Sequence, residues 1–111
     1  MDQSLVKGST AMLVLKLLDG KDLYGYQMIE ELRRRSDHTF DLKAGTLYPL
    51  LHSLEQQGLV TAWEEDMGTA RPRRYYHLTD AGKTALKEKK EEWDIYASAV
   101  QKVLGGGVSL A

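Results

Sequence analysis

The sequence of 111 residues contains no cysteine and no long hydrophobic run. Without cysteine the chain can form no disulfide, thiolate nucleophile or cysteine metal site. The apolar run of residues 11–15 ends at Lys16 and is far too short to cross a bilayer. The start of the chain also lacks a secretory leader pattern, because Asp2 opens it and Lys7 interrupts it. Together these absences predict an intracellular protein.

An excess of positive charge is also missing, since the formal net charge is −1 and the isoelectric point is about 6.3. Proteins that coat nucleic acid without selection are usually strongly basic, so any DNA binding by this chain must come from a local patch. Hydrophobic residues make up 42% and charged residues 28%, which is typical of a globular protein and argues against disorder. The length suits one small domain with an appended element.

Catalytic and metal-binding constellations are scarce too. His38, His52 and His77 lie in three different expected elements, and none has the spacing of a metal-binding histidine pair. The glycines do not form a phosphate-binding loop. The sequence therefore predicts a protein that is not an enzyme and that uses no metal or cofactor.

What the sequence does contain is a regular succession of periodic segments. Apolar residues at helical spacing predict helices, and β-forming residues on both sides of a Gly- and Pro-containing loop predict a hairpin. Thr79 and Asp80 cap a long last helix, which Gly105 ends. Pro49 removes a hydrogen bond from the third helix, so we expect a mild kink unless that helix starts near Gly45. The expected helices cover residues 4–18, 24–35, 43–57 and 80–104, and the expected strands cover residues 59–63 and 73–78.

The third helix carries candidate binding residues on one face. Four leucines between residues 47 and 54 form an apolar stripe, so the opposite face must meet solvent or a partner. That face is polar but almost uncharged, and such side chains can address base edges when a helix lies in the major groove. The alternative is an ordinary solvated face, which composition alone slightly favours. The residues of the polar face are Thr46, Tyr48, His52, Ser53, Gln56 and Gln57.

The hairpin changes this balance because it carries Arg71, Arg73 and Arg74 at its loop and on its return strand. Guanidinium groups there can bind phosphates beside the groove. Alternatively they pair with the acidic residues 64–66 across the hairpin, but exposed pairs contribute little and would not prevent phosphate binding. The adjacent tyrosines, residues 75–76, alternate faces, so one should enter the core while the other faces outward. Three helices followed by a basic hairpin predict a winged helix-turn-helix that binds DNA.

The chain also carries these short motifs: YGY at residues 24–26, GTLYPLL at 45–51, LE at 54–55, GLV at 58–60, and RYYHLT at 74–79 followed by Gly82. In this order, over about residues 13–86, they resemble the signature of the PadR family of transcriptional regulators. The resemblance implies a prokaryotic winged-helix repressor that binds operator DNA as a homodimer.

The resemblance also implies roles for individual residues. Thr46 and Tyr48 would lie on the DNA-facing side of the recognition helix, and residues 24–26 would lie near the phosphate backbone. The hairpin arginines would belong to the wing. His52 and Gln56 occupy positions that vary in this family, so they are the candidates for setting sequence preference. The expected DNA-binding residues are Tyr24, Gln27, Lys43, Thr46, Tyr48, His52, Ser53, Gln56, Arg71, Arg73, Arg74 and Tyr75.

The last helix has apolar residues at intervals of three and four. Leu86, Trp93 and Val100 repeat every seven residues, which indicates a seam that packs against another helix. The charged run of residues 87–92 is most simply a solvated face. Under the resemblance this helix mediates dimerisation, and two recognition helices about 34 Å apart would read a palindrome. The expected dimer interface is Leu86, Trp93, Tyr96, Val100 and Val103.

Two roles fit Trp93. It is most simply a large anchor of the dimer interface. Because some PadR-like proteins bind planar aromatic effectors at that interface, Trp93, Tyr96 and Met12 would alternatively line a pocket for a small aromatic effector.

We therefore expect a mainly α-helical protein with a small β-hairpin. A winged helix-turn-helix DNA-binding domain would cover residues 1–79, a C-terminal dimerisation helix residues 80–104, and a flexible tail residues 105–111. The expected function is that of a cytoplasmic, nucleoid-associated homodimeric repressor that binds a palindromic operator and is released by the effector. Two alternatives stay open: a winged-helix module that docks proteins without operator binding, and a small-molecule binding protein with vestigial DNA contacts. Arginines beside an uncharged helix face favour DNA over docking.

Overall fold

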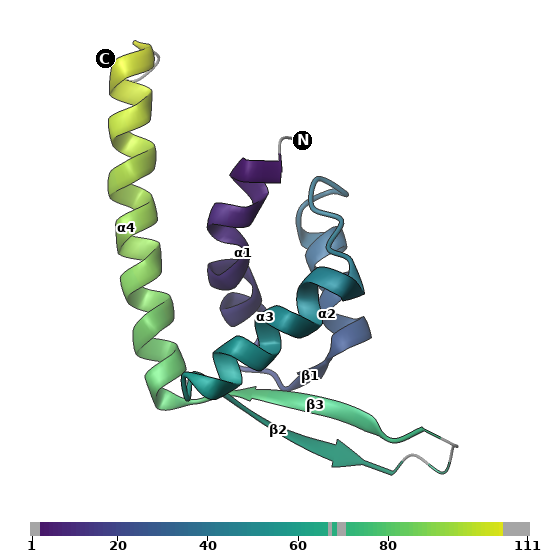
Figure 1. Cartoon of the computed structure of the whole chain (residues 1–111). Helices are drawn as coiled ribbons and strands as arrows, with labels where there is room; N and C mark the ends of the chain where they lie inside the picture. Colours follow the sequence, from purple (N-terminus) through teal and green to yellow (C-terminus); the bar gives the residue numbers. More distant parts are fainter. Residues whose placement is uncertain (1–2, 67, 69–70, 106–111) are drawn as a thin grey trace.

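Three helices, a small sheet and a long final helix follow one another in the computed structural model, which describes residues 3–66, 68 and 71–105 (Figure 1). This order confirms the expected winged helix-turn-helix with a C-terminal helix. The elements are α1 (Gln3–Leu17), β1 (Leu23–Tyr24), α2 (Gly25–Arg35), α3 (Ala44–Gln56), β2 (Val60–Glu65), β3 (Arg73–Leu78) and α4 (Asp80–Leu104).

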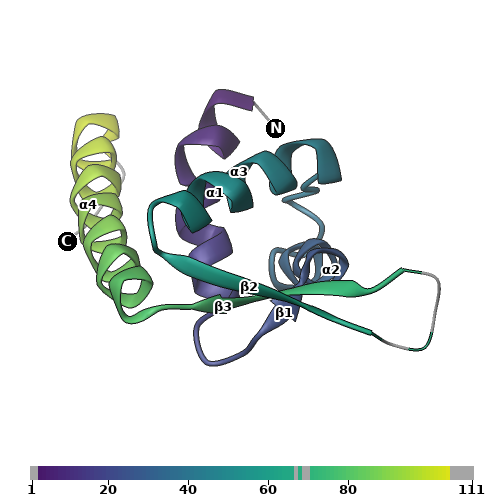
Figure 2. The ribbon, with the colours of Figure 1, turned by 60° about the horizontal axis from the view of Figure 1, so that its bottom comes forward.

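The sheet contains one strand that the sequence did not reveal. β1 and β2 both pair antiparallel with β3, which gives the strand order β1-β3-β2. The expectation that Tyr24 lies in the second helix is wrong, because Tyr24 ends β1 and α2 begins at Gly25. A strand of two residues is too short to show the alternation that identifies strands in a sequence. β1 attaches the start of α2 to the hairpin, and the three short helices lie on one side of the sheet (Figure 2).

The core lies between these helices and the inner face of the sheet. The expected leucine stripe of α3 is confirmed, because Leu47, Leu51 and Leu54 are buried. Leu50 is half-buried and packs against the same core. Pro49 lies within the first two turns of α3, so the backbone hydrogen bond that it removes is close to the start of the helix. Burial of the leucine stripe leaves the opposite face of α3 to the solvent.

α4 leaves the hairpin at a tightly packed joint. The Thr79 hydroxyl accepts a hydrogen bond from the Gly82 amide at 3.0 Å and donates one to the Gly58 carbonyl at 2.7 Å. A Cβ at Gly82 would collide with the Leu59 carbonyl oxygen, so a larger residue cannot fit without a shift of the backbone. From this joint α4 runs beside α1, and its far half extends past the other helices (Figure 1).

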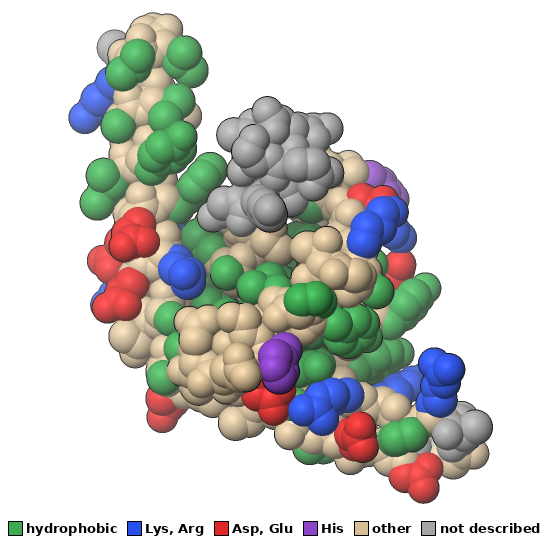
Figure 3. Space-filling model, viewed as in Figure 1, with side chains coloured by type: hydrophobic (Ala, Val, Ile, Leu, Met, Phe, Trp, Pro, Cys, Tyr) green, Lys and Arg blue, Asp and Glu red, His purple; other side chains and the backbone are tan. Residues whose placement is uncertain are grey.

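The far half of α4 carries hydrophobic side chains on its surface (Figure 3). The helix ends at Gly105, which adopts a left-handed conformation with φ 75°. The remainder of the expected tail, residues 106–111, lies outside the described residues. No helix within the described ranges is long and apolar enough to span a membrane.

Candidate nucleic-acid interface

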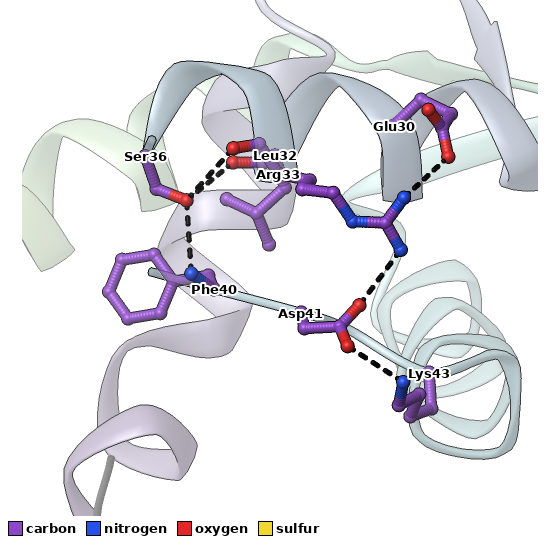
Figure 4. A network of polar contacts seen from close by, with 7 residues as sticks. All are labelled: Glu30, Leu32, Arg33, Ser36, Phe40, Asp41 and Lys43. Atoms are coloured by element: carbon purple, nitrogen blue, oxygen red, sulfur yellow. Dashed lines mark hydrogen bonds and ion pairs between the residues drawn. The ribbon is translucent and has the colours of Figure 1, made fainter. Parts of the chain in front are cut away.

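A network of ion pairs fixes the turn between α2 and α3 (Figure 4). The Arg33 guanidinium donates to Glu30 on its own helix and to Asp41 in the turn, at 2.9 Å each. Lys43, the residue that precedes α3, donates to the other oxygen of Asp41 at 2.7 Å. The hydrogen bonds that Asp41 accepts, first from Lys43 and then from Arg33, lower its pKa to about 2. The network ties the first turn of α3 to the end of α2.

The exposed face of α3 contains the residues that the sequence assigned to it. Among the residues of α3, Glu55 alone is charged, and it lies at the edge toward the hairpin. The Ser53 hydroxyl accepts a hydrogen bond from Gln57 at 3.1 Å. The face therefore offers neutral hydrogen-bonding groups, as expected of a helix that reads bases. Its exposed residues are Thr46, Tyr48, His52, Ser53, Gln56 and Gln57.

Tyr48 joins α3 to the start of α2. Its ring lies against the backbone of Gly25, where an added Cβ would come within 2.6 Å of the ring carbon Cζ. Glycine permits this close approach because it has no side chain. Tyr48 is nevertheless 46% exposed. It is thus held by its neighbour and still accessible to a ligand.

Gln27 and Tyr24 have contacts within the folded chain. Gln27 Oε1 accepts a hydrogen bond from the Tyr24 amide at 3.0 Å, which satisfies a free donor at the start of α2. The half-buried Tyr24 ring packs edge-on against Tyr75, with ring centroids 5.4 Å apart. These contacts account for both residues without a ligand, and their expected contacts with DNA stay a prediction.

Arg73 lies on the outer face of the sheet, next to an aromatic cluster of Tyr24, Trp63 and Tyr75. Trp63 and Tyr75 oppose each other on β2 and β3, and their rings stack with centroids 5.8 Å apart. The Arg73 guanidinium lies 4.6 Å from the centroid of the Tyr24 ring, within the range of a cation–π contact. The aromatic cluster therefore supports an exposed guanidinium without neutralising its charge.

Arg74 lies on the opposite face of β3, toward α3. Its Nη2 donates to both carboxylate oxygens of Glu55, at 3.2 and 3.3 Å. Its guanidinium also lies 5.9 Å from the ring centroid of Tyr76, which is buried in the core. Burial alone would lower the pKa of Arg74, but Tyr76 and Glu55 outweigh it, and the net direction is upward. The expected alternation of the tyrosines is confirmed, because Tyr76 is buried and Tyr75 lies on the outer face.

Among the ion pairs of the described residues, none joins the acidic residues 64–66 to Arg73 or Arg74. Glu64 and Glu65 oppose the two β3 arginines across the strands. The ion pair of Arg74 is nevertheless with Glu55 of α3. The carboxylate of Asp66 accepts a hydrogen bond from the Gly68 amide at 2.9 Å. Arg71 lies in the loop before β3 and is exposed.

The three histidines lie apart. His38 follows α2, His52 is on α3, and His77 is on β3, where its Nδ1 lies 2.7 Å from Asp22. Within the part of the chain that the structure describes, no group of three or more histidine or acidic side chains could hold a metal ion.

A groove between α1 and α4 is a second candidate site. It has a volume of about 500 Å³, and Met12, Leu86 and Trp93 are among its apolar lining residues. Tyr96, which was expected to join Met12 and Trp93, lines a separate hollow with Val100 nearer the end of α4. The charged residues that line the groove are Lys16, Asp19, Lys83, Lys87 and Lys90.

The seam of α4 is exposed only beyond its first turns. Leu86 is half-buried against the core of its own chain. Farther along, Trp93 is 46% exposed and Val103 is 86% exposed. Ile95, at 72% exposure, lies outside the heptad seam and was not among the residues expected at the interface. The exposed large hydrophobic residues of this half are Trp93, Ile95, Tyr96, Val100, Val103 and Leu104.

Comparison with known proteins gives a consistent answer. Residues 14–88 match the model of the transcriptional regulator PadR-like family. The transcriptional regulator Rv3488 of Mycobacterium tuberculosis is 38% identical over 85 residues, which are 77% of this chain and 73% of that protein. The crystal structure of a PadR family transcriptional regulator from Eggerthella lenta is 36% identical with a TM-score of 0.82, covering 94% of this chain and 88% of that one. A transcriptional regulator from Clostridium thermocellum has a TM-score of 0.85 at 28% identity, covering 90% and 97%.

Proposed function

The chain belongs to the PadR-like family of transcriptional regulators, and from that premise we propose that it is a homodimeric repressor of a palindromic operator. Members of this family are DNA-binding regulators and not enzymes. The observation that carries the proposal is the uncharged, exposed face of α3 beside the arginines of the wing, the hairpin of β2 and β3. In the complex, α3 lies in the major groove and the wing contacts the flanking phosphates.

The proposed contacts with DNA divide by the chemistry of the side chains. Neutral side chains of α3 address base edges, and His52 and Gln56 set the sequence preference. The cations and tyrosines around α3 position the protein on the phosphate backbone. The proposed residues are Tyr24, Gln27, Lys43, Thr46, Tyr48, His52, Ser53, Gln56, Arg71, Arg73, Arg74 and Tyr75.

The homodimer in this proposal forms through α4, residues 80–104, whereas residues up to 79 read the DNA. A row of large apolar side chains exposed on one helix is typical of a protein–protein contact. A second copy of α4 would cover that row, with Trp93, Tyr96, Val100 and Val103 as contacts and Leu86 at the edge of the interface. Two copies of α3 would then stand about 34 Å apart, one turn of the duplex, on a palindrome. Such a repressor acts at the nucleoid in the cytoplasm of a prokaryote.

The α1–α4 groove supports a small aromatic effector as part of the proposal. Met12 and Trp93 offer apolar and planar contacts, and the groove opens beside the exposed half of α4. Four lysines and one aspartate line it, so a ligand with a negative charge fits its rim better than a cation does. Tyr96 would reach such a ligand from the partner copy or from the end of the groove.

A titration tests the proposal. The purified protein is added to a labelled duplex from upstream of its own gene, with excess unrelated DNA, and fluorescence anisotropy is followed at several salt concentrations. Saturable, salt-sensitive binding that survives the competitor supports a sequence-specific regulator. If no binding survives, a steep salt dependence on the unrelated DNA indicates that the operator lies elsewhere. Absence of any affinity for DNA overturns the proposal in favour of a protein-docking module.

A further inference from the structure

The contact between Glu55 and Arg74 is the feature of the DNA-facing surface that simple phosphate binding does not explain. We propose that Glu55 is a positioning residue for DNA binding. Through its ion pair Glu55 holds the wing against α3. The pair also refines the role of Arg74 given above: Arg74 stays on the DNA-facing surface, but its paired guanidinium adds little to the phosphate contacts that release counterions. The inference deepens the proposed function and rests on it, because it concerns the same surface.

A carboxylate on this helix needs an explanation. α3 from Ala44 to Gln56 carries no other charge, and a negative charge beside a duplex repels phosphates. The Glu55 side chain is 35% exposed, so solvent reaches the pair and its contribution to folding stability is small. A neutral residue at this position would therefore favour DNA binding at little cost to the fold. We therefore expect the Glu55 carboxylate to affect DNA binding through its ion pair with Arg74.

The position of Glu55 on α3 connects it to the base-reading face. Helical spacing places Glu55 on the same flank as His52, three residues earlier, and Tyr48, seven residues earlier. Histidine, acidic and basic side chains lie close together where α3 meets the hairpin (Figure 3). The ion pair thus joins the wing to α3 next to the residue proposed to set sequence preference. A fixed wing fixes the direction from which α3 enters the groove.

The two β3 arginines consequently differ in how much of their positive charge is available to DNA. Arg73 rests on an uncharged ring and keeps its full positive charge. Arg74 donates to both carboxylate oxygens of Glu55 through Nη2, and its guanidinium also lies against Tyr76. The Glu55–Arg74 pair as a whole is neutral. Release of counterions follows the number of phosphates that cations neutralise, and the Arg74 guanidinium binds Glu55 instead of a phosphate. Arg73 should therefore contribute to the salt dependence of binding and Arg74 should contribute little.

Removal of the carboxylate should therefore strengthen non-specific binding while it weakens discrimination. In Glu55→Gln the Arg74 charge becomes available to a phosphate, and the slope of log K against log salt should steepen by about 0.9. Over a fourfold range of salt, one such contact corresponds to about a 3.5-fold additional loss of affinity. The ratio of affinities for the operator and for unrelated DNA should fall, because the wing is no longer held to α3.

The experiment compares wild type with Glu55→Gln, Arg74→Gln, the double variant and Arg73→Gln on both duplexes between 50 and 200 mM salt. The matched control is Glu88→Gln on the exposed side of α4, which changes the net charge equally but lies away from the wing. We expect Arg73→Gln to lower the slope by about 0.9 and Arg74→Gln to change it little. The double variant should have the slope of Arg74→Gln, since Glu55 acts through Arg74.

The outcomes separate the inference from the proposed function. A Glu55→Gln variant with the slope and discrimination of Glu88→Gln overturns the inference, and so does an Arg74→Gln variant that loses as much slope as Arg73→Gln. In both cases wild-type binding leaves the proposed function intact. A wild type without affinity for any duplex overturns the proposed function itself. Should Glu55→Gln unfold, the difference between the two arginine variants still decides the inference.

Discussion

The surface around α3 and the far half of α4 differ in how their exposed side chains are held. Around α3, side chains proposed to touch DNA are held by neighbours: Arg73 by a tyrosine ring, Arg74 by a carboxylate and Tyr48 by Gly25. On the far half of α4, large apolar residues such as Trp93 and Val103 project from a single helix. The first surface is organised within one chain, whereas the second has the character of half an interface.

This difference shows what each surface needs in order to work. Polar groups that are already in place bind a charged ligand without a large cost of ordering. Exposed apolar groups gain free energy only when another surface removes them from water. A single chain should therefore suffice for weak contact with DNA, and a second copy should be required for the full arrangement on an operator. The family match, which ends at residue 88, covers the first surface and stops before most of the second.

The largest effect is expected at the joint between the two sides. Gly82→Ala places a methyl group against the Leu59 carbonyl and within 2.5 Å of Leu78 Cδ1, so it should lower the free energy of unfolding by about 3 kcal/mol. Gly45→Ala is the control, since nothing lies within 4 Å of an added Cβ there, and it should stabilise α3 by up to about 1 kcal/mol. Urea denaturation measures both. Equal stability of the two variants would mean that the joint is not rigid.

The next effect concerns association. Trp93→Ala should weaken the dimer about 30-fold, corresponding to about 2 kcal/mol for the loss of a large aromatic anchor, as read by sedimentation. Ile95→Ala is the matched control, because Ile95 is exposed and apolar but lies off the seam. Equal losses from both substitutions would show that the interface extends around the helix. An unchanged dimer in Trp93→Ala would leave Trp93 as a residue of the α1–α4 groove.

The sequence predicted the long periodic elements well, for a physical reason. In α3 the spacing of apolar residues decides which face is buried, so its exposed polar face follows from the sequence. In α4 the same kind of spacing identifies the apolar seam, which is largely exposed in the single chain. β1 could not be predicted, because its two residues gain their structure from pairing with β3, about fifty residues later. A pattern of neighbouring residues gives no information about a pairing with such a distant strand.

The contacts that each site residue makes were harder to predict than which residues belong to the site. Alternation along β3 separates Arg73 from Arg74 as it separates the tyrosines, but it does not identify their partners. Those partners, Tyr24 and Glu55, come from other elements and are brought to β3 only by the tertiary fold. The exposure of Ile95 was not predicted, because the heptad pattern identifies only the residues of one seam and Ile95 lies outside it.

A smaller effect tests the organised surface. Gly25→Ala should displace the Tyr48 ring, lower stability by about 1 kcal/mol and weaken operator binding several-fold, because Tyr48 loses its fixed position. In a Tyr48→Ala background the same substitution should cost little, since the ring that it strikes is absent. Anisotropy and urea denaturation on the four proteins of this cycle give the coupling. Additive effects would show that the contact between Gly25 and Tyr48 does not organise the site.

The smallest effect concerns the turn that leads into α3. Hydrogen bonds from Lys43 and then Arg33 lower the pKa of Asp41 from 3.8 to about 2. A carboxyl with a depressed pKa in the folded state stabilises the fold above its unfolded pKa, and this contribution is lost as the pH falls through the folded one. The difference in urea midpoint between wild type and Asp41→Asn should thus be constant above about pH 5 and shrink toward pH 2. Glu31, whose pKa is lowered to about 2 mainly by Arg34, titrates in both proteins and cancels from the difference. A difference that grows as the pH falls would mean that the charge of Asp41 opposes the fold, and the turn would then owe its shape to the backbone alone.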